Sequence, residues 1–196
     1  VHINDGFWLP RIETNRTVSI PSAFKECEKN GRFDNFAIAG GLKKWEHRGD
    51  FSFDDTDPYE VIEGASYSLA VKYDPQLDHY LDSVINIIAA AQEPDGYLTT
   101  CVTNKCERLS GWWGRSKWEK LNSHELYNSG HMYEAAVAHY RATGKRTFLD
   151  VAIKNADLVC KVFGPGEGQK HVPSGHPIVE MALSKLYKAV SYKQLP

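Results

Sequence analysis

The chain lacks several features that would assign it to a membrane, nucleic-acid-binding or β-rich class. No apolar run in its 196 residues approaches the roughly 20 that a membrane-spanning helix needs, so no membrane partner is expected. Basic residues form no stripe and the formal net charge is −2, so nucleic acid is not an expected partner. Strand-like alternation of apolar and polar residues is almost absent. The length suffices for one domain with a sizeable core.

Cysteine is also scarce, and the four cysteines are Cys27, Cys101, Cys106 and Cys160. A chain of this length needs no disulfide framework, so we expect free thiols. Cys101 and Cys106 have a Cys-x4-Cys spacing that a metal pair could use. No second pair and no histidine close in the sequence completes a tetrahedral set, so we expect no metal site in this chain.

Apolar residues recurring at steps of three and four predict an all-α fold. We expect a first helix over about 12–30, broken or kinked by Pro21, and a central helix that begins at a Ser123 or Asn122 cap. The other expected helices cover about 59–73, 76–92, 147–163 and a stretch from about 177. The segments 31–58 and 97–121 are expected to be loops.

Three acidic residues, Asp54, Asp55 and Asp57, precede the expected helix at 59–73. Asp57 is suited to cap that helix, with Pro58 at its first position. A calcium loop would need alternating ligands over about 12 residues and a closing glutamate, which this pattern does not provide. We therefore predict a structural role for the acidic cluster.

An internal repeat supports a fold made of helical hairpins. The segments Ser68–Asp82, Ala136–Asp150 and Ala182–Pro196 can be aligned, and each holds the end of one helix, a short elbow and the start of the next. Repeated hairpins predict a solenoid or a closed toroid. The third copy stops where its second helix should begin, and the chain starts without methionine or a signal core, so we expect the front part of a longer protein.

The central stretch at 121–137 places titratable side chains among would-be core positions. His124 and His131 lie two helical turns apart, and Tyr127 lies between them on the same stripe. Such a stripe is poor core material unless it faces a wet cavity. The alternative is that both histidines are satisfied by neighbouring backbone groups.

Five motifs occur in a fixed order along the chain, at 54–63, 92–98, 124–131, 163–165 and 175–183. They read Asp-Asp-Thr-Asp-Pro-Tyr-Glu-Val-Ile-Glu, Gln-Glu-Pro-Asp-Gly-Tyr-Leu, His-Glu-Leu-Tyr with Gly-His, Phe-Gly-Pro, and Gly-His-Pro with Glu180 and Ala-Leu. Together they resemble glycoside hydrolase family 127, the β-L-arabinofuranosidases, and its close relatives. The resemblance covers nearly the whole chain from Phe7-Trp8.

The resemblance implies an (α/α)6 barrel followed by β-sandwich domains. Residues 1–196 would then be a single domain forming about half of the barrel, with the C-terminal half and the β-sandwich domains absent. The implied activity is retaining hydrolysis of β-linked L-arabinofuranose, so the expected partner is a carbohydrate, an L-arabinofuranose-containing glycan. The family analogy also implies a bacterial protein, either exported or cytoplasmic.

By the same resemblance, the family uses a cysteine thiolate nucleophile held on zinc by further cysteines and a glutamate, with a separate glutamate as acid/base. None of the four cysteines here matches that context, and no adjacent Cys-Cys pair exists. The catalytic residues are therefore unassigned. Zinc is expected only in the full-length enzyme, and this chain should be inactive without its missing C-terminal part.

Sugar recognition does carry over residue by residue. His124 and His176 match family histidines that line the arabinose pocket, and imidazoles can donate to or accept from sugar hydroxyls. His131, Tyr127 and Asp57 are expected to support this pocket, His131 mainly through helix packing. The loop tryptophans could stack on an aglycone; they are Trp112, Trp113 and Trp118.

Two other functions remain open at this stage. A different hydrolase or lyase on the same barrel could act on an acidic or rare sugar, with Arg48, Arg108 and Arg115 meeting a carboxylate and the three aspartates supplying a catalytic pair. A non-catalytic helical scaffold could instead bind protein on its concave face. A scaffold predicts hydrophobic anchors, rather than histidine and tyrosine, on the inner helices.

Overall fold

A computed structural model of the chain describes residues 3, 5–109, 111, 114, 116–120 and 123–191. Within these residues the structure is helical, and the only β feature is an isolated bridge between Phe163 and Lys170. The predicted all-α class is confirmed. The elements are α1 Trp8–Thr14, a π-helical turn Asn15–Ser19, α2 Ile20–Lys29, α3 Arg32–Ala39, α4 Thr56–Val71, α5 Pro75–Ala90, α6 Thr100–Thr103, a 3-10 turn Glu107–Leu109, α8 Glu125–Thr143, α9 Thr147–Val162 and α10 Ile178–Ser191.

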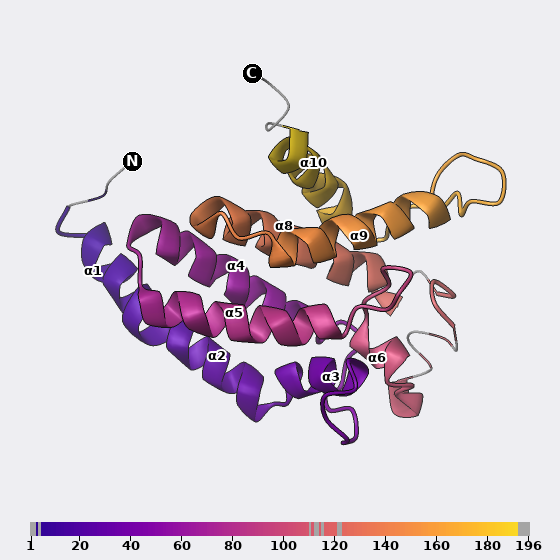
Figure 1. Cartoon of the computed structure of the whole chain (residues 1–196), viewed down its shortest axis with the longest axis horizontal. Coiled ribbons are helices and arrows are strands. Elements are labelled where there is room, and N and C mark those ends of the chain that lie inside the picture. Colours follow the sequence, from indigo (N-terminus) through magenta and orange to yellow (C-terminus); the bar gives the residue numbers. More distant parts are fainter. Residues whose placement is uncertain are drawn as a thin grey trace.

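Helices α4, α8 and α10 pack successively against one another, and α5 packs against α9 and α3 (Figure 1). The first two repeat copies fall where the hairpins α4–α5 and α8–α9 turn. Asp74 ends the first elbow as the N-cap of α5, and its carboxylate accepts from the N–H groups of Gln76 and Leu77. Gly144 opens the second elbow at φ 74°, a left-handed conformation that glycine adopts without strain.

The N-terminal helix does not break at Pro21. Instead, α1, the π-helical turn and α2 run on without a gap from Trp8 to Lys29, and Pro21 lies in the first turn of α2. A proline ring clashes with the carbonyl four residues earlier and donates no hydrogen bond. The wider π turn directly before it takes up that distortion, so the chain continues as one helical segment.

Three local predictions were wrong. Residues 31–58 are not all loop, because α3 forms there and buries Phe33 and Phe36. The segment 97–121 likewise contains α6 and a 3-10 turn. Asp57 does not cap α4, since the N-cap is Asp55 and the Asp57 carboxylate accepts a hydrogen bond from Arg32 at 2.7 Å. Short helices carry little periodic signal, which is why α3 and α6 were missed. The Asp57 carboxylate binds Arg32 instead of the N–H groups of the first turn of α4.

The core is continuous from α2 to α10 and contains several fully buried aromatic side chains, among them Tyr59, Tyr133 and Phe148. The hydroxyl of Tyr133 on α8 donates to Asn155 Oδ1 on α9 at 2.7 Å. Asn155 in turn donates to the carbonyl of Gly96 at 2.8 Å. This buried polar chain fixes how the central hairpin sits on the segment that follows α5.

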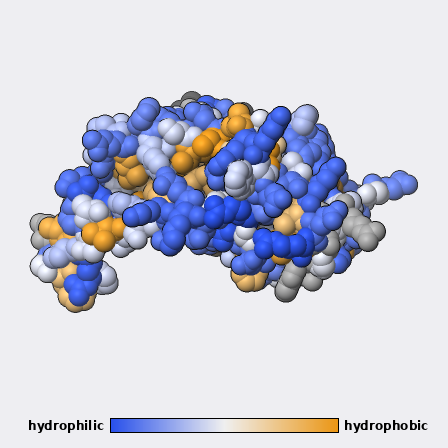
Figure 2. Space-filling view, turned by 90° about the horizontal axis from the view of Figure 1, so that it is seen from below, coloured by the Kyte–Doolittle hydropathy of each residue, from blue (hydrophilic) through white to orange (hydrophobic). Residues whose placement is uncertain are grey.

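The surface is mostly hydrophilic on the face seen from below, with apolar side chains gathered in separate patches (Figure 2). On α10, Met181 and Tyr187 are 51% and 70% exposed. Tyr187 lies in the third repeat copy, and Met181 lies directly before it. The last residues of that copy, 192–196, lie outside the described residues. Across the described part of the chain, every helix is too short or too polar to cross a bilayer.

Tyr133→Phe tests the buried polar chain. Removing the hydroxyl leaves the Oδ1 of Asn155 without its donor, so we expect the free energy of unfolding to fall by about 1–3 kcal/mol. Urea denaturation followed by circular dichroism measures it. Tyr187→Phe, at an exposed tyrosine, is the matched control and should change stability by less than about 0.5 kcal/mol. Equal effects of the two changes would contradict this assignment.

Candidate functional site

His124 occupies the turn that leads into α8. It is the N-cap of that helix with φ 65°, a left-handed conformation that is costly for a residue with a Cβ. Neither Ser123 nor Asn122 is the cap residue; Ser123 lies one position earlier, with its hydroxyl 2.7 Å from Glu125 Oε2. The strained backbone sends the His124 ring outward, where its centroid lies 4.8 Å from that of Phe53.

His176 approaches the same place from the start of α10. Its ring centroid lies 5.2 Å from that of His124 and 4.9 Å from that of Tyr127. The preceding Gly175 has φ 84°, and the hydroxyl of Ser174 lies 2.8 Å from the His176 carbonyl oxygen. A glycine turn therefore brings the imidazole back over α8.

We use the term histidine cluster for Phe53, His124, Tyr127, His131 and His176. The rings of Tyr127 and His131 are 4.5 Å apart. His176 is exposed and the other four members are half-buried, so the cluster is open to solvent rather than sealed in the core. The structure thus brings His124 and His176 together and places the expected supporting residues Tyr127 and His131 beside them.

His131 is tied to α4 as well as to the cluster. Its Nδ1 lies 3.4 Å from Glu60 Oε1. Burial lowers the pKa of His131, and the nearby carboxylates of Glu63 and Glu134 oppose that shift without reversing it. The His131 ring therefore lies between Glu60 on α4 and the ring of Tyr127. Its expected role in helix packing stays a prediction.

Gly130 allows α10 to come close enough for this arrangement. A Cβ at Gly130 would lie 2.8 Å from Ile178 Cγ2 and 2.8 Å from the Val179 backbone nitrogen. Real Cβ contacts of that length do not occur, because the atoms would overlap. The bare backbone of α8 is therefore the surface on which the first turn of α10 rests.

Two hydrogen bonds connect the loop that carries Phe53 to the start of α8. The Ser52 hydroxyl donates to the carbonyl of Ser123 at 2.7 Å, and Asn128 Nδ2 donates to the Ser52 carbonyl at 3.2 Å. Both bonds are buried, where hydrogen bonding is strongly favoured over leaving the groups unpaired. Phe53 is therefore positioned by the same backbone that positions His124.

Glu125 is a positioning residue that the sequence did not single out. It is buried, and its carboxylate accepts from the Ser123 hydroxyl at 2.7 Å, from the Trp118 N–H at 2.9 Å and from the Tyr97 hydroxyl. Burial raises its pKa, while these hydrogen bonds act in the opposite direction. Its partners Tyr97 and Trp118 come from the segment before α8, so the sequence around Glu125 gave no signal of this role.

The acidic cluster before α4 is occupied by internal partners. Arg32 binds both Asp54 and Asp57, at 3.0 Å and 2.7 Å. Asp55 accepts from the backbone N–H and the hydroxyl of Thr100 at 2.7 Å and 2.5 Å. These carboxylates hold α3, α4 and α6 together. Asp57 acts on the histidine cluster through its charge. The pKa of Tyr127 is raised first by burial, then by the charge of Glu60 and last by that of Asp57.

The expected loop tryptophans and arginines contribute less. Trp112, Trp113 and Arg115 lie outside the described residues. Trp118 packs edge-on against Tyr97 and Phe163, with centroids 5.1 Å and 5.4 Å away, so it belongs to the packing beneath the loop. Arg48 donates to the Lys29 carbonyl, and Arg108 pairs with Asp50 and the Gly49 carbonyl. The two described arginines therefore have internal partners and do not converge on one anion.

Two groups of described residues place metal-ligating atoms within 4.8 Å of one another. One is Asp78, Asp82 and His139, where Lys145 Nζ already bridges the two carboxylates at 2.7 Å and 2.6 Å. The other is His47, Cys101 and Cys106. The sequence showed no histidine near the cysteine pair because His47 comes from a loop far earlier in the chain. Neither group lies in the histidine cluster.

Gly130→Ala tests the helix contact. The added methyl group overlaps α10, so we expect a loss of about 1–3 kcal/mol in the free energy of unfolding. The ring-to-ring NMR contacts between His124 and His176 should weaken with it. Gly64→Ala in α4 is the matched control, because nothing lies within 4 Å of its added Cβ. A gain in stability for Gly130→Ala equal to that of the control would contradict the contact.

Asp55 gives a pH-dependent prediction. Burial raises its pKa from 3.8 to about 6, against the hydrogen bonds from Thr100. The folded chain therefore favours the protonated form of Asp55. The stabilisation from this carboxyl is fully present below its pKa in the unfolded chain, 3.8, and is lost as the pH rises through its pKa in the folded chain, about 6. Relative to Asp55→Asn, the parent should lose on the order of 3 kcal/mol of unfolding free energy between about pH 4 and pH 7. Denaturation at several pH values measures this difference, and a pH-independent value would contradict it.

Comparison with known proteins places the chain in context. Residues 1–195 match the model of the β-L-arabinofuranosidase, GH127 catalytic domain. The chain is 41% identical over 162 residues to the non-reducing end β-L-arabinofuranosidase of Bifidobacterium longum subsp. longum, which covers 82% of this chain and 24% of that protein.

Solved structures agree with the fold. The GH127 β-arabinofuranosidase BT3674 matches with a TM-score of 0.91 and 51% identity, over 99% of this chain and 31% of that one. Ara127N-Se, a GH127 β-L-arabinofuranosidase from Geobacillus stearothermophilus T6, matches with a TM-score of 0.90 and 39% identity, over 98% and 30%. The predicted partial helical barrel is thereby confirmed, and the chain spans less than a third of these relatives. This chain belongs to the GH127 β-L-arabinofuranosidase catalytic-domain family.

Proposed function

We propose that this chain carries the sugar-binding part of a retaining β-L-arabinofuranosidase, with His124 and His176 as the residues that contact the arabinofuranose. The observation that carries the proposal is their meeting: two imidazoles from the starts of different helices lie 5.2 Å apart in a cluster that is open to solvent. The relatives' names give the substrate class.

The chemistry of the histidine cluster suits a small sugar. Each imidazole can donate from one ring nitrogen and accept at the other, which matches hydroxyl groups that do both. Phe53 and Tyr127 add apolar ring surface around the imidazoles, and Tyr127 adds a hydroxyl. Pockets for small ligands combine an apolar lining with a few convergent polar groups in this way.

The described residues do not fit a zinc-bound thiolate at this cluster. Cys27 is buried in α2 and Cys160 is exposed on α9, while Cys101 and Cys106 are buried with Tyr97 in a second, smaller core. None of these four cysteines belongs to the histidine cluster. We therefore propose that the nucleophile, the acid/base and the family's zinc ligands belong to the part of the relatives' length that this chain does not span.

The two alternatives are less well supported. An acidic-sugar enzyme would need free cationic groups near the cluster, yet Arg48 and Arg108 are held by internal partners. A protein-binding scaffold would present hydrophobic anchors where the structure presents two imidazoles and a phenol. The carbohydrate reading is thus the one that the side chains favour.

Titration with L-arabinose tests the proposal. We expect the ring resonances of His124 and His176 to shift in NMR spectra, and His176→Ala to weaken binding by about 10-fold, since a lost hydrogen bond costs roughly 1.5 kcal/mol. His176 is exposed, so the fold should survive, which circular dichroism can verify.

His171→Ala is the matched control, because His171 is an exposed histidine on the same connection between α9 and α10. It should bind arabinose as the parent does. Equal binding by the parent, His171→Ala and His176→Ala would remove His176 from the pocket. Binding that responds to hydrophobic peptides but not to arabinose would favour the scaffold.

A further inference from the structure

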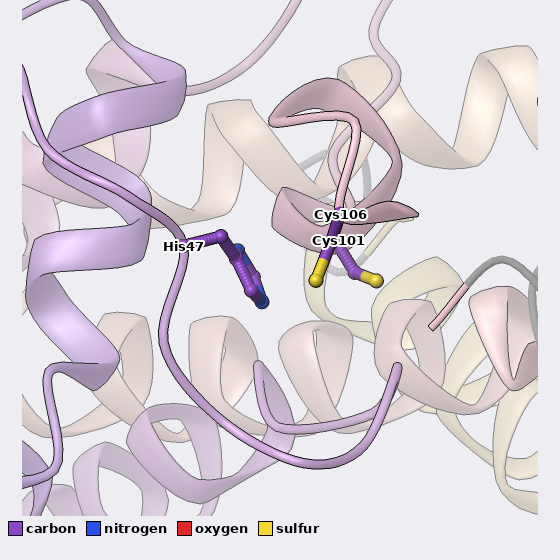
Figure 3. A group of neighbouring side chains, drawn as sticks. All are labelled: His47, Cys101 and Cys106. Atoms are coloured by element: carbon purple, nitrogen blue, oxygen red, sulfur yellow. The ribbon is translucent and has the colours of Figure 1, made fainter. Parts of the chain in front are cut away.

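A second group of side chains lies away from the histidine cluster, beneath α6. Cys101 is within α6, Cys106 follows it, and His47 comes from the extended loop between α3 and α4. One ligand atom from each lies within 4.8 Å of the other two. The His47 side chain points from its loop toward the two sulfur atoms (Figure 3).

We propose that His47, Cys101 and Cys106 form a binding site for a soft divalent metal ion, with Zn²⁺ as the best match. Thiolate and imidazole are the ligands that zinc prefers, with Zn–S near 2.3 Å and Zn–N near 2.1 Å in general. Ligand atoms around a tetrahedral ion at those lengths are roughly 3.5 Å apart, so the three groups need only small adjustments. A water molecule would complete the tetrahedral set.

The imidazole has a ring nitrogen available for the ion. His47 Nε2 is buried and has no hydrogen-bond partner among the described residues. A buried polar atom without a partner is costly unless something binds it. An ion held between this nitrogen and two sulfurs would satisfy it.

Asn104 orients the other side of the His47 ring. Its Nδ2 lies 3.2 Å from His47 Nδ1 and donates to the Asn35 carbonyl at 3.0 Å. Metal binding at Nε2 places the ring proton on Nδ1, so the Asn104 amide would have to turn its oxygen toward that proton and give up its hydrogen bond to the Asn35 carbonyl. With its amide turned, Asn104 would be the outer partner that fixes the ring and the tautomer of the metal-ligating histidine.

The electrostatics around the group are suited to a neutral site. Burial, helped by Arg108 and Arg32, lowers the pKa of His47 to about 4, so the imidazole is uncharged at neutral pH. Burial raises the pKa of Cys101, and its neighbour Cys106 adds to this, so Cys101 is a thiol in the metal-free site. Zn²⁺ bound by both sulfurs as thiolates would leave no net charge to bury, with the thiol protons released to solvent.

An ion there would join the loop before α4 to the segment 100–109. That loop is already tied down by Asn35, whose side chain exchanges two hydrogen bonds with the backbone of Arg48 at 2.6 Å and 2.8 Å. A few residues later it carries Phe53 into the histidine cluster. The site would thus stiffen the loop that forms one wall of that cluster.

The test uses the reduced, metal-free 196-residue chain, titrated with Zn²⁺ against a competing chromophoric chelator. We expect one zinc ion per chain, and Co²⁺ in its place should give sulfur-to-metal charge-transfer absorption. Cys101→Ser, Cys106→Ser and His47→Gln should each raise the Kd by at least about 100-fold, because losing even an outer partner costs roughly 10–100-fold.

Cys160→Ser is the matched control, since Cys160 is exposed on α9, and it should keep the parent Kd and cobalt spectrum. Circular dichroism of each metal-free variant checks the fold; if a buried cysteine change unfolds the chain, His47→Gln decides, because His47 is only partly buried. Three results would overturn the proposal: no stoichiometric binding, tight binding that survives His47→Gln, or a Cys101–Cys106 disulfide in the protein as purified.

Discussion

The close contact between α8 and α10 at Gly130 is the constraint on which the histidine cluster depends. A side chain at position 130 would collide with Ile178 and Val179, so the first turn of α10 packs directly on the backbone of α8. Because His176 lies just ahead of that turn, the depth of the contact sets its distance from His124. A packing detail of one residue thereby controls the geometry of the candidate sugar site.

A second constraint fixes the other half of the cluster. His124 is held in a left-handed backbone conformation, which needs support from its surroundings to persist. The buried Glu125 supplies that support through hydrogen bonds from Ser123 and Trp118, while the Ser52 hydroxyl donates to the Ser123 carbonyl. Strain at the site is thus offset by a polar network directly behind it, which is a common arrangement where a side chain must point in one direction.

Sequence patterns predicted the long helices well and the short ones poorly. Helices α4, α5, α8, α9 and α10 have enough turns for apolar periodicity to show, and the repeat located two of their elbows. Helix α3 has only eight residues, and its buried face includes Asn35, so the pattern was too short to see. Asp57 was predicted to cap α4, but its carboxylate forms an ion pair with Arg32. The sequence could not show this, because an ion pair between distant segments has no local signature.

The sequence by itself determined the helical class, the hairpin repeat and the family, since these rest on local periodicity and on ordered motifs. It also singled out His124 by its helical spacing with Tyr127 and His131, whereas His176, and the role of both histidines in sugar binding, came only from the resemblance. The tertiary structure decided that the two imidazoles meet beside Phe53, that the three aspartates are internal ties, and that His47 lies against Cys101 and Cys106. The reason is physical: a contact between residues far apart in the chain depends on how deeply helices pack, and that depth is set by side-chain volumes on both partners at once.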